Sequence, residues 1–207
     1  MTILDPDVEA RYEALVSRVV EVVERALGHE VLANRVLSPP TSLSPWRPAW
    51  RGLLRARRRL TARGRTLLHA DVRGCYPRIT PGAVERSLHG LGAETDDVRP
   101  IVEMLDALQE HGVAGLPIGP DPSAVLANGV LVPVDRMLTD AGSSHVRWVD
   151  DVWAAAPDGD RAARILDRLR GVLDRIGLEV NEDKTIVIDA VDAAEAFRTK
   201  RASGGGL

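Results

Sequence analysis

Apolar residues recur along the chain at helical spacing in six segments. Residues 5–28 begin with an Asp-Pro pair and carry a broad apolar stripe, which predicts a capped helix that ends at Gly28. Five further segments share the helical spacing: 49–63, 81–91, 96–111, 121–140 and 160–176. Pro133 is expected to kink the helix over 121–140, because a proline inside a helix removes a hydrogen bond and clashes with the preceding turn.

Short apolar runs predict four strands. Residues 66–72 are predicted to form a buried strand that ends at an aspartate, and residues 145–156 a hairpin whose two strands meet at Asp150 and Asp151. Residues 185–188 make the last strand. The order of strand, helices, hairpin, helix and strand is the split β-α-β plan of a ferredoxin-like sheet, so we expect an α+β fold.

This strand order brings distant acidic residues together. A strand-crossover-strand unit within one sheet makes its two strands parallel, so the end of the first strand and the tip of the hairpin lie on the same edge. We therefore expect Asp71 beside Asp150 and Asp151. Three close carboxylates repel one another, and a pair of divalent cations such as Mg²⁺ offsets that repulsion and aligns an in-line phosphoryl displacement. The alternative is a plain hairpin with a solvated polar turn, although tight hairpins favour Asn-Gly or Asp-Gly.

Charge is distributed unevenly along the chain. Its 207 residues, 44% of them apolar, are enough to bury one ordinary core. The stretch between Val31 and Ala70 contains nine arginines and no acidic residue, although the whole chain has a net charge of −3. Arginine forks pair with phosphate oxygens, which predicts a site for polyphosphate or nucleic acid. The candidates are Arg47, Arg51, Arg55 and Arg58. The alternative is a solvated helix face.

Several classes of protein are excluded by what the sequence lacks. Cys75 is the single cysteine, which excludes an internal disulfide or a cysteine zinc cluster and fits a reducing compartment such as the cytoplasm. The histidines show no metal-ligand spacing, and the glycine-rich phosphate loop and the Gly-x-Ser-x-Gly elbow are both missing. The sequence has neither a signal peptide pattern nor eighteen consecutive apolar residues, so we expect no membrane partner.

Four motifs in order resemble the palm of reverse transcriptases, RNA-directed DNA polymerases. They lie at residues 70–79 (ADVRGCYPRI), 115–123 (GLPIGPDPS), 146–151 (VRWVDD) and 177–185 (GLEVNEDKT). The GLPIGP form is most similar to the bacterial abortive-infection and defence-associated reverse transcriptases. The resemblance implies a palm over residues 66–190. A helical, basic, fingers-like segment over 1–65 would precede it, and a short helical or flexible tail over 191–207 would follow it.

The resemblance also implies a catalytic centre. Asp71 and Asp150 would be the principal ligands of Mg²⁺, or of Mn²⁺ as an alternative. Asp151 would lie beside them, and the carbonyl of Val72 would add a further oxygen. Lys184 would protonate the leaving pyrophosphate. The alternative for Lys184 is a residue that caps exposed surface.

The same resemblance implies a nucleotide-binding site. Tyr76 stands where the family places an aromatic gate that clashes with a 2′-hydroxyl; the alternative is a ring that packs on the sheet. Gly119 would let the backbone approach the base pair, and Ser123 opens the helix behind it; the alternative is an ordinary Pro-Gly loop. This chain departs from the family at two positions. Ile118 replaces a glutamine common in the family, and Trp148 replaces the usual tyrosine or phenylalanine.

The predicted activity is the addition of dNTPs to a primer 3′-hydroxyl along an RNA template, which yields DNA, and the subgroup suggests a role in antiphage defence. About seventeen residues follow the last strand, too few for a thumb that clamps the duplex. We therefore expect a fragment of a longer protein, a protein partner that supplies the clamp or the primer, or non-processive synthesis. Two alternatives remain: a non-catalytic nucleic-acid-binding or regulatory subunit, and another palm-type enzyme such as a cyclic-nucleotide synthase.

Overall fold

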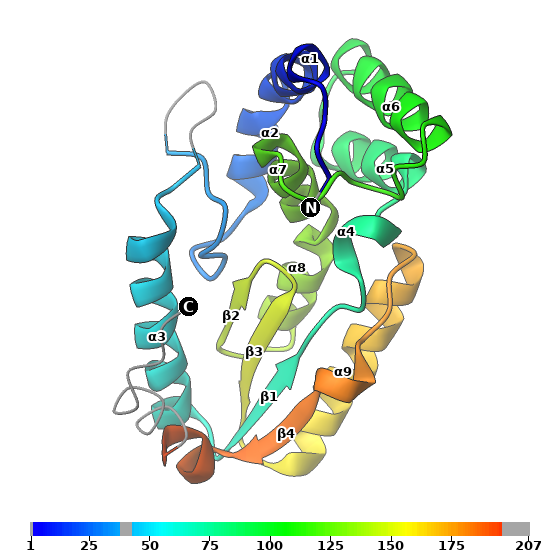
Figure 1. Cartoon of the computed structure of the whole chain (residues 1–207). Helices are drawn as coiled ribbons and strands as arrows, with labels where there is room; N and C mark the ends of the chain where they lie inside the picture. Colours follow the sequence, from blue (N-terminus) through cyan, green and yellow to red (C-terminus); the bar gives the residue numbers. More distant parts are fainter. Residues whose placement is uncertain (1, 38–42, 196–207) are drawn as a thin grey trace.

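The computed structural model describes residues 2–37 and 43–195, and Figure 1 shows the course of the chain. The helices are α1 (Pro6–Ser17), α2 (Val20–Ala26), α3 (Trp46–Arg63), α4 (Cys75–Arg78), α5 (Pro81–Leu91), α6 (Thr95–Glu110), α7 (Asp121–Val130), α8 (Val132–Asp140) and α9 (Gly159–Arg175). The strands are β1 (Thr66–Ala70), β2 (His145–Trp148), β3 (Asp151–Ala156) and β4 (Ile186–Asp189), with the short 3₁₀ helix η1 (Glu182–Lys184) before β4.

The four strands form one sheet in the order β2-β3-β1-β4. Every neighbouring pair is antiparallel, and in the pairing of β1 with β3 the Cα of Ala70 lies opposite that of Val152. Strands β1 and β2 are therefore parallel to one another, with β3 between them. This is the ferredoxin-like order, so the predicted α+β fold is confirmed.

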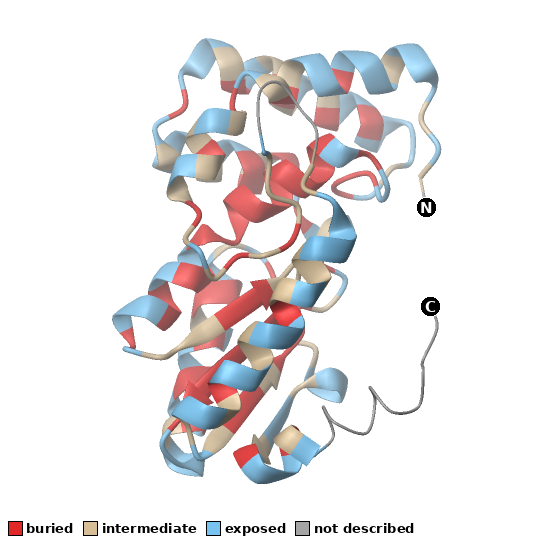
Figure 2. Ribbon diagram, turned by 90° about the vertical axis from the view of Figure 1, so that its left-hand side faces the viewer, coloured by how far each residue is buried: buried red, intermediate tan, exposed pale blue. Residues whose placement is uncertain are grey.

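Helices cover both faces of the sheet (Figure 1). On one face α9 packs against side chains that point into the main core, such as Leu68 and Val152. On the other face α3 crosses the sheet, and its Leu53 and Leu60 share a second apolar cluster with Trp153. Figure 2 shows most of the sheet as buried for this reason. Side chains alternate between the faces of a strand, so both sets of alternate positions in β3 are apolar.

The N-terminal segment is divided between two places. Helices α1 and α2 pack against α5, α6 and α7 at the top of Figure 1, whereas α3 packs against β1, β2 and β3. Residues 1–65 therefore do not form a separate unit that packs only on itself. The domain boundaries at residues 65 and 190 remain predictions.

Two predicted helices are each divided in the structure. The segment over 5–28 forms α1 and α2, which are separated at residues 18–19. The segment over 121–140 breaks at Leu131 instead of kinking at Pro133. Pro133 lies in the first turn of α8, a position where its missing N–H costs no hydrogen bond. Helix α3 begins at Trp46, three residues before the predicted start.

The C-terminal part of the chain is described as far as residue 195. Residues 190–195 continue from β4 as a helix. The rest of the predicted tail, residues 196–207, lies outside the described residues, and so do residues 38–42. Within the described ranges no helix combines the length and the apolar character needed to cross a membrane.

Candidate active site

Three aspartates meet at one end of the sheet. Asp71 directly follows β1, and Asp150 and Asp151 lie at the turn where β2 joins β3. Because Ala70 pairs with Val152 in antiparallel register, the end of β1 lies beside the start of β3. The structure therefore brings Asp71 next to the Asp-Asp turn, although the two segments are far apart in sequence.

The electrostatics of the site centre on Asp150. Burial raises the pKa of its carboxyl above the usual range, and the negative charges of Asp71 and Asp151 raise this pKa further. A hydrogen bond that the carboxyl accepts from the backbone N–H of Asp150 lowers this pKa, and so does the charge of Lys184. A cation bound between the carboxylates would remove this repulsion.

Asp71 is held from the opposite side by the loop that follows α9. Its side chain is 6% exposed. Oδ1 accepts a 2.7 Å hydrogen bond from the side-chain amide of Asn181, and Oδ2 accepts a 3.3 Å hydrogen bond from Nζ of Lys184. The backbone N–H of Asn181 also donates to the carbonyl of Asp71, at 2.8 Å. The predicted Lys184 is thus placed within the acidic site.

Asp151 is held by a stack of side chains on the α3 face of the sheet. Its Oδ1 lies 2.8 Å from Nε2 of His69, and the His69 ring stacks on Trp153 with 4.1 Å between centroids. The guanidinium of Arg57, from α3, lies over the same indole at 4.0 Å from its centroid. Burial lowers the pKa of Arg57, and the charge of Asp151 opposes this shift. This stack therefore connects the arginine-rich helix to the acidic site.

The donor set suits a hard cation, although a complete site is not assembled. Among residues 2–37 and 43–195, no group of three or more His, Cys, Asp or Glu side chains is arranged to hold a metal ion. Asp71 and Asp151 are turned onto protein donors instead. The oxygens of Asp71, Asp150 and the Val72 carbonyl are the ligand type that Mg²⁺ prefers. Each carboxylate oxygen of Asp71 accepts one hydrogen bond from a side chain and keeps a further lone pair for an ion.

Tyr76 lies on the one-turn helix α4, half-buried beside the acidic site. Burial raises the pKa of its phenol, and the nearby charge of Asp150 contributes to the shift. The carbonyl of Tyr76 accepts a 2.9 Å hydrogen bond from the N–H of Leu116. Gly115 has φ of +60°, and a Cβ at this position would lie 2.5 Å from the Tyr76 carbonyl oxygen. The loop over 115–120 is thus seated tightly on α4.

The three predicted nucleotide-binding residues of the next segment are not equally accessible. Ile118 and Gly119 are exposed, and the Ile118 backbone is bonded to Thr2, which donates to its carbonyl at 2.7 Å. Ser123 has no exposed area, and its hydroxyl lies 3.2 Å from that of Tyr12 on α1. Helix α1 therefore encloses the Ser123 side chain, and a contact of Ser123 with a nucleotide stays a prediction.

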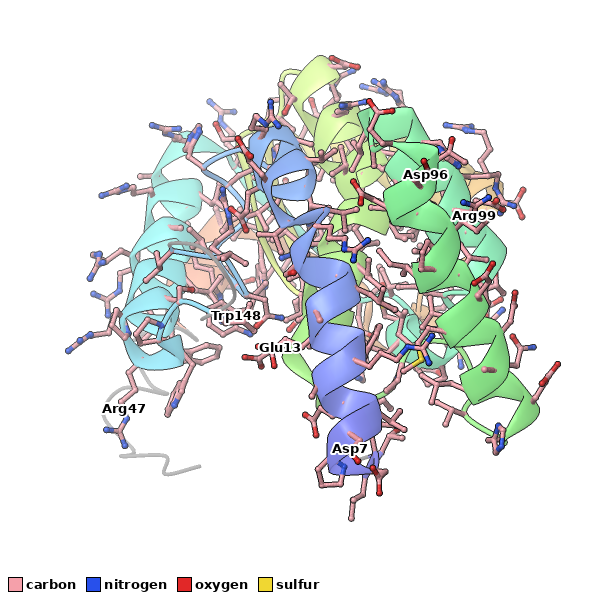
Figure 3. The ribbon with its side chains drawn as sticks, turned by 90° about the horizontal axis from the view of Figure 1, so that it is seen from above. Asp7, Glu13, Arg47, Asp96, Arg99 and Trp148 are labelled. Carbon is pink, nitrogen blue, oxygen red and sulfur yellow. The ribbon has the colours of Figure 1, made fainter. Side chains whose placement is uncertain are left out.

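The four predicted phosphate-binding arginines are exposed on α3. They are Arg47, Arg51, Arg55 and Arg58. Figure 3 shows nitrogen-tipped side chains that project from α3 away from the body of the protein, with Arg47 at one end. Across the described part of the chain, none of the four has an acidic partner. Their charges are thus available to phosphate groups.

Trp148 ends β2, immediately before the turn. Its indole meets that of Trp50, on α3, edge to face, with centroids 5.3 Å apart and planes at 80°. Figure 3 shows Trp148 in the space between α3 and the N-terminal helices. The residue that departs from the family's usual aromatic therefore helps to hold α3 on the sheet.

Three residues that contact the site segments were not assigned roles from the sequence. His69 lies two positions before Asp71, and alternation along a strand places it on the same face. Asn181 belongs to the fourth motif and bonds Asp71. Arg147 is a charged residue inside an apolar strand, and it is fully buried against Asp135. A charged residue in an apolar run is the sequence signal from which an internal partner could have been inferred.

Comparisons with known proteins agree with this fold. The family model described as reverse transcriptase (RNA-dependent DNA polymerase) matches residues 17–194, most of the chain. No curated protein matches the sequence. Among solved structures, telomerase from Candida albicans, in complex with the TWJ fragment of telomeric RNA, is similar with a TM-score of 0.51 and 16% identity. Apo telomerase from Candida tropicalis is similar with a TM-score of 0.57 and 15% identity.

The alignments cover most of this chain but a much smaller share of each telomerase chain. The C. albicans alignment covers 87% of this chain and 35% of the telomerase chain, and the C. tropicalis alignment covers 86% and 37%. The chain thus spans about a third of the length of these telomerases. At this identity the likeness concerns the fold alone.

Proposed function

This chain belongs to the reverse transcriptase family, and on that premise we propose that it adds dNTPs to a primer 3′-hydroxyl along an RNA template. The observation that carries the proposal is the convergence of Asp71, Asp150 and Asp151 at one end of the sheet. Burying like charges together is unfavourable for folding, so such clusters are typical of functional sites.

In this proposal the acidic residues hold Mg²⁺, or Mn²⁺, as a pair of ions. Asp71, Asp150 and the carbonyl of Val72 are the ligands, and Asp151 lies beside them. When bound, such ions activate the attacking hydroxyl and stabilise the charge on the phosphate. Lys184 lies 3.3 Å from Asp71, where its ammonium is a candidate proton donor to the leaving pyrophosphate.

The remaining predicted residues receive positioning roles. Tyr76 is half-buried beside Asp150 and is proposed to favour dNTPs by excluding a 2′-hydroxyl. Gly119 and the exposed Ile118 are proposed to face the base pair. The exposed α3 arginines are proposed to bind the phosphates of the RNA template or of the triphosphate, because a guanidinium pairs with phosphate oxygens in a bidentate manner. They are Arg47, Arg51, Arg55 and Arg58.

Primer extension on poly(rA)/oligo(dT) with Mg²⁺ or Mn²⁺ tests the proposal. Asp150→Asn preserves the size of the side chain and removes its charge, so incorporation of dTTP should fall by about 100-fold or more. Asp106→Asn, an exposed carboxylate on α6, is the matched control and should keep wild-type activity. Equal activity of wild type and Asp150→Asn would reject the proposed catalytic centre.

A second candidate function is a non-catalytic nucleic-acid-binding or regulatory subunit. The pairing of Asp71 with Lys184 and of Asp151 with His69 favours it, because these carboxylates already have protein partners. In that case RNA binding should depend on salt and be unaffected by Mg²⁺ or by Asp150→Asn. Absence of incorporation together with such binding would select this candidate.

The biological setting is proposed from the subgroup resemblance. We propose a bacterial role in antiphage defence, in the cytoplasm, with a protein partner that supplies the duplex clamp or the primer. Phage challenge of cells that carry the intact locus or the Asp150→Asn variant tests this role, and equal phage titres in both would reject it.

A further inference from the structure

The turn that carries Asp150 contains a backbone conformation that valine rarely adopts. Val149 lies between β2 and β3 with φ of +56°. In this left-handed region the Cβ of an L-residue crowds the carbonyl oxygen, and a β-branched side chain increases the crowding. Such a conformation persists only where neighbouring groups hold it. The groups that hold Val149 therefore also determine the position of Asp150.

Arg147 supplies a contact that holds the turn. Its Nη1 donates a 2.9 Å hydrogen bond to the carbonyl of Val149 and another, also of 2.9 Å, to Oδ1 of Asn128. Its Nε and Nη2 donate to the two carboxylate oxygens of Asp135, at 2.8 and 2.7 Å. The side chain is completely buried. The guanidinium is thus fixed between α7, α8 and the turn.

The hydrogen bonds that restrain Arg147 extend to the segment that follows α2. The side-chain amide of Asn128 donates to the carbonyls of residues 33 and 34, both at 3.2 Å. The backbone N–H of Arg147 donates to the carbonyl of Glu30 at 2.9 Å, and its carbonyl accepts from the N–H of Leu32 at 3.1 Å. Side chain and backbone of Arg147 are therefore both restrained, which limits the movement of the turn.

We propose that Arg147 is a positioning residue, which keeps the Asp150 carboxylate in place by holding the carbonyl of Val149. It acts through the turn and contacts neither substrate nor metal. The effect on reaction rate rests on the proposed function, whereas the effect on the turn is independent of it. If Arg147 served only the stability of the fold, any folded variant without its guanidinium would keep the turn unchanged.

Two variants and one control separate these roles. Arg147→Met together with Asp135→Leu replaces the buried pair by apolar side chains, which often preserves folding, and removes the donor to Val149. Arg147→Lys keeps the charge and loses the planar fork. The control is Arg161→Met, because Arg161 likewise donates to a backbone carbonyl, that of Ala141 at 2.7 Å, without contacting the turn or the segment over 30–34.

The readouts are the backbone amide NMR signals of residues 149–151, the affinity for Mn²⁺ measured by electron paramagnetic resonance, and kcat and KM for dTTP incorporation. In both Arg147 variants we expect the amide signals to shift or split. Mn²⁺ affinity and kcat should each fall by about tenfold, with KM changed by less than about twofold, as for other residues that orient a ligand indirectly. The control should match wild type in all three.

Wild-type amide signals and Mn²⁺ affinity in a folded Arg147 variant would overturn the proposal. If the double variant does not fold, Arg147→Lys decides by the same criteria. Adding Val149→Gly to Arg147→Lys should recover part of the Mn²⁺ affinity, because glycine adopts positive φ without support, and no recovery would also count against the proposal. If wild type neither incorporates dTTP nor binds Mn²⁺, the proposed function fails, and the amide signals still decide on positioning.

Discussion

Nζ of Lys184 lies 3.3 Å from Oδ2 of Asp71, across 113 positions of the sequence. The same ammonium lowers the pKa of Asp150, against the larger effect of burial. One cation therefore contacts the first carboxylate and lowers the pKa of the second. Because its side chain is 65% exposed, Lys184 is able to move between this pairing and a bound substrate.

Loss of Lys184 should slow catalysis more than it weakens substrate binding. Lys184→Met is expected to lower kcat for dTTP incorporation by about 100-fold, because general acid catalysis contributes at least this much. Lys184→Arg should lose most of this contribution to kcat as well, since a guanidinium does not release its proton. Arg99→Met, which removes an exposed ion pair on α6, is the control. Unchanged kcat in Lys184→Met would leave the residue with a structural role only.

The α3 arginines should bind RNA mainly through phosphate contacts. Arg51→Glu with Arg55→Glu is expected to weaken binding to single-stranded RNA and to reduce the slope of log K against log salt by about two, one for each lost phosphate contact. Fluorescence anisotropy at increasing salt measures both quantities. Arg11→Glu with Arg18→Glu makes the same change of charge, in α1 and directly after it, and should leave the slope within about 0.5 of wild type. Equal effects of the two pairs would indicate a general charge effect.

Gly115 should tolerate no side chain. At φ of +60°, a Cβ would lie 2.5 Å from the carbonyl oxygen of Tyr76 and 2.6 Å from that of Pro77. Gly115→Ala is expected to lower the free energy of unfolding by about 3 kcal/mol or more, from backbone strain and overpacking together. Gly112, at φ of +87°, has no atom within 4 Å of its Cβ position. Gly112→Ala should therefore lower the free energy of unfolding by only about 1 kcal/mol. Urea denaturation measures both variants, and equal losses of unfolding free energy would contradict the packing argument.

Cys75 should be unreactive in the native protein. Burial raises the pKa of its thiol to about 12, with the negative charge of Asp150 as the next cause. At pH 8 the thiolate fraction is then about one in ten thousand, and the thiolate is the reactive form. We expect Ellman's reagent to label Cys75 only after unfolding in guanidinium. Rapid labelling of folded protein, with its circular dichroism unchanged, would show that the segment around α4 opens readily.

Much of the site was predictable because it follows from local periodicity and one rule of topology. Alternating apolar runs identified β1 and the hairpin, and the parallel relation of β1 and β2 placed Asp71 beside Asp150. Neither step needs knowledge of side-chain contacts. The ferredoxin-like sheet was predictable for the same reason, since each element carries its own pattern.

The contacts between distant side chains were not predictable in this way. Ser123 is enclosed by Tyr12, and His69 holds Asp151, through pairings that no local pattern records. The division of helix 121–140 at Leu131, and the separation of α1 and α2 from α3, depend on how whole elements pack.

The sequence by itself thus determined which elements form and which end of the sheet carries the aspartates, because both depend on short-range pattern and chain direction. Only the tertiary structure decided what those aspartates contact. Arg147 illustrates the difference: its charge inside an apolar strand is visible in the sequence, but its partners Asp135 and Asn128 come from two other helices. A buried charge requires a partner, and the fold alone determines which one lies within reach.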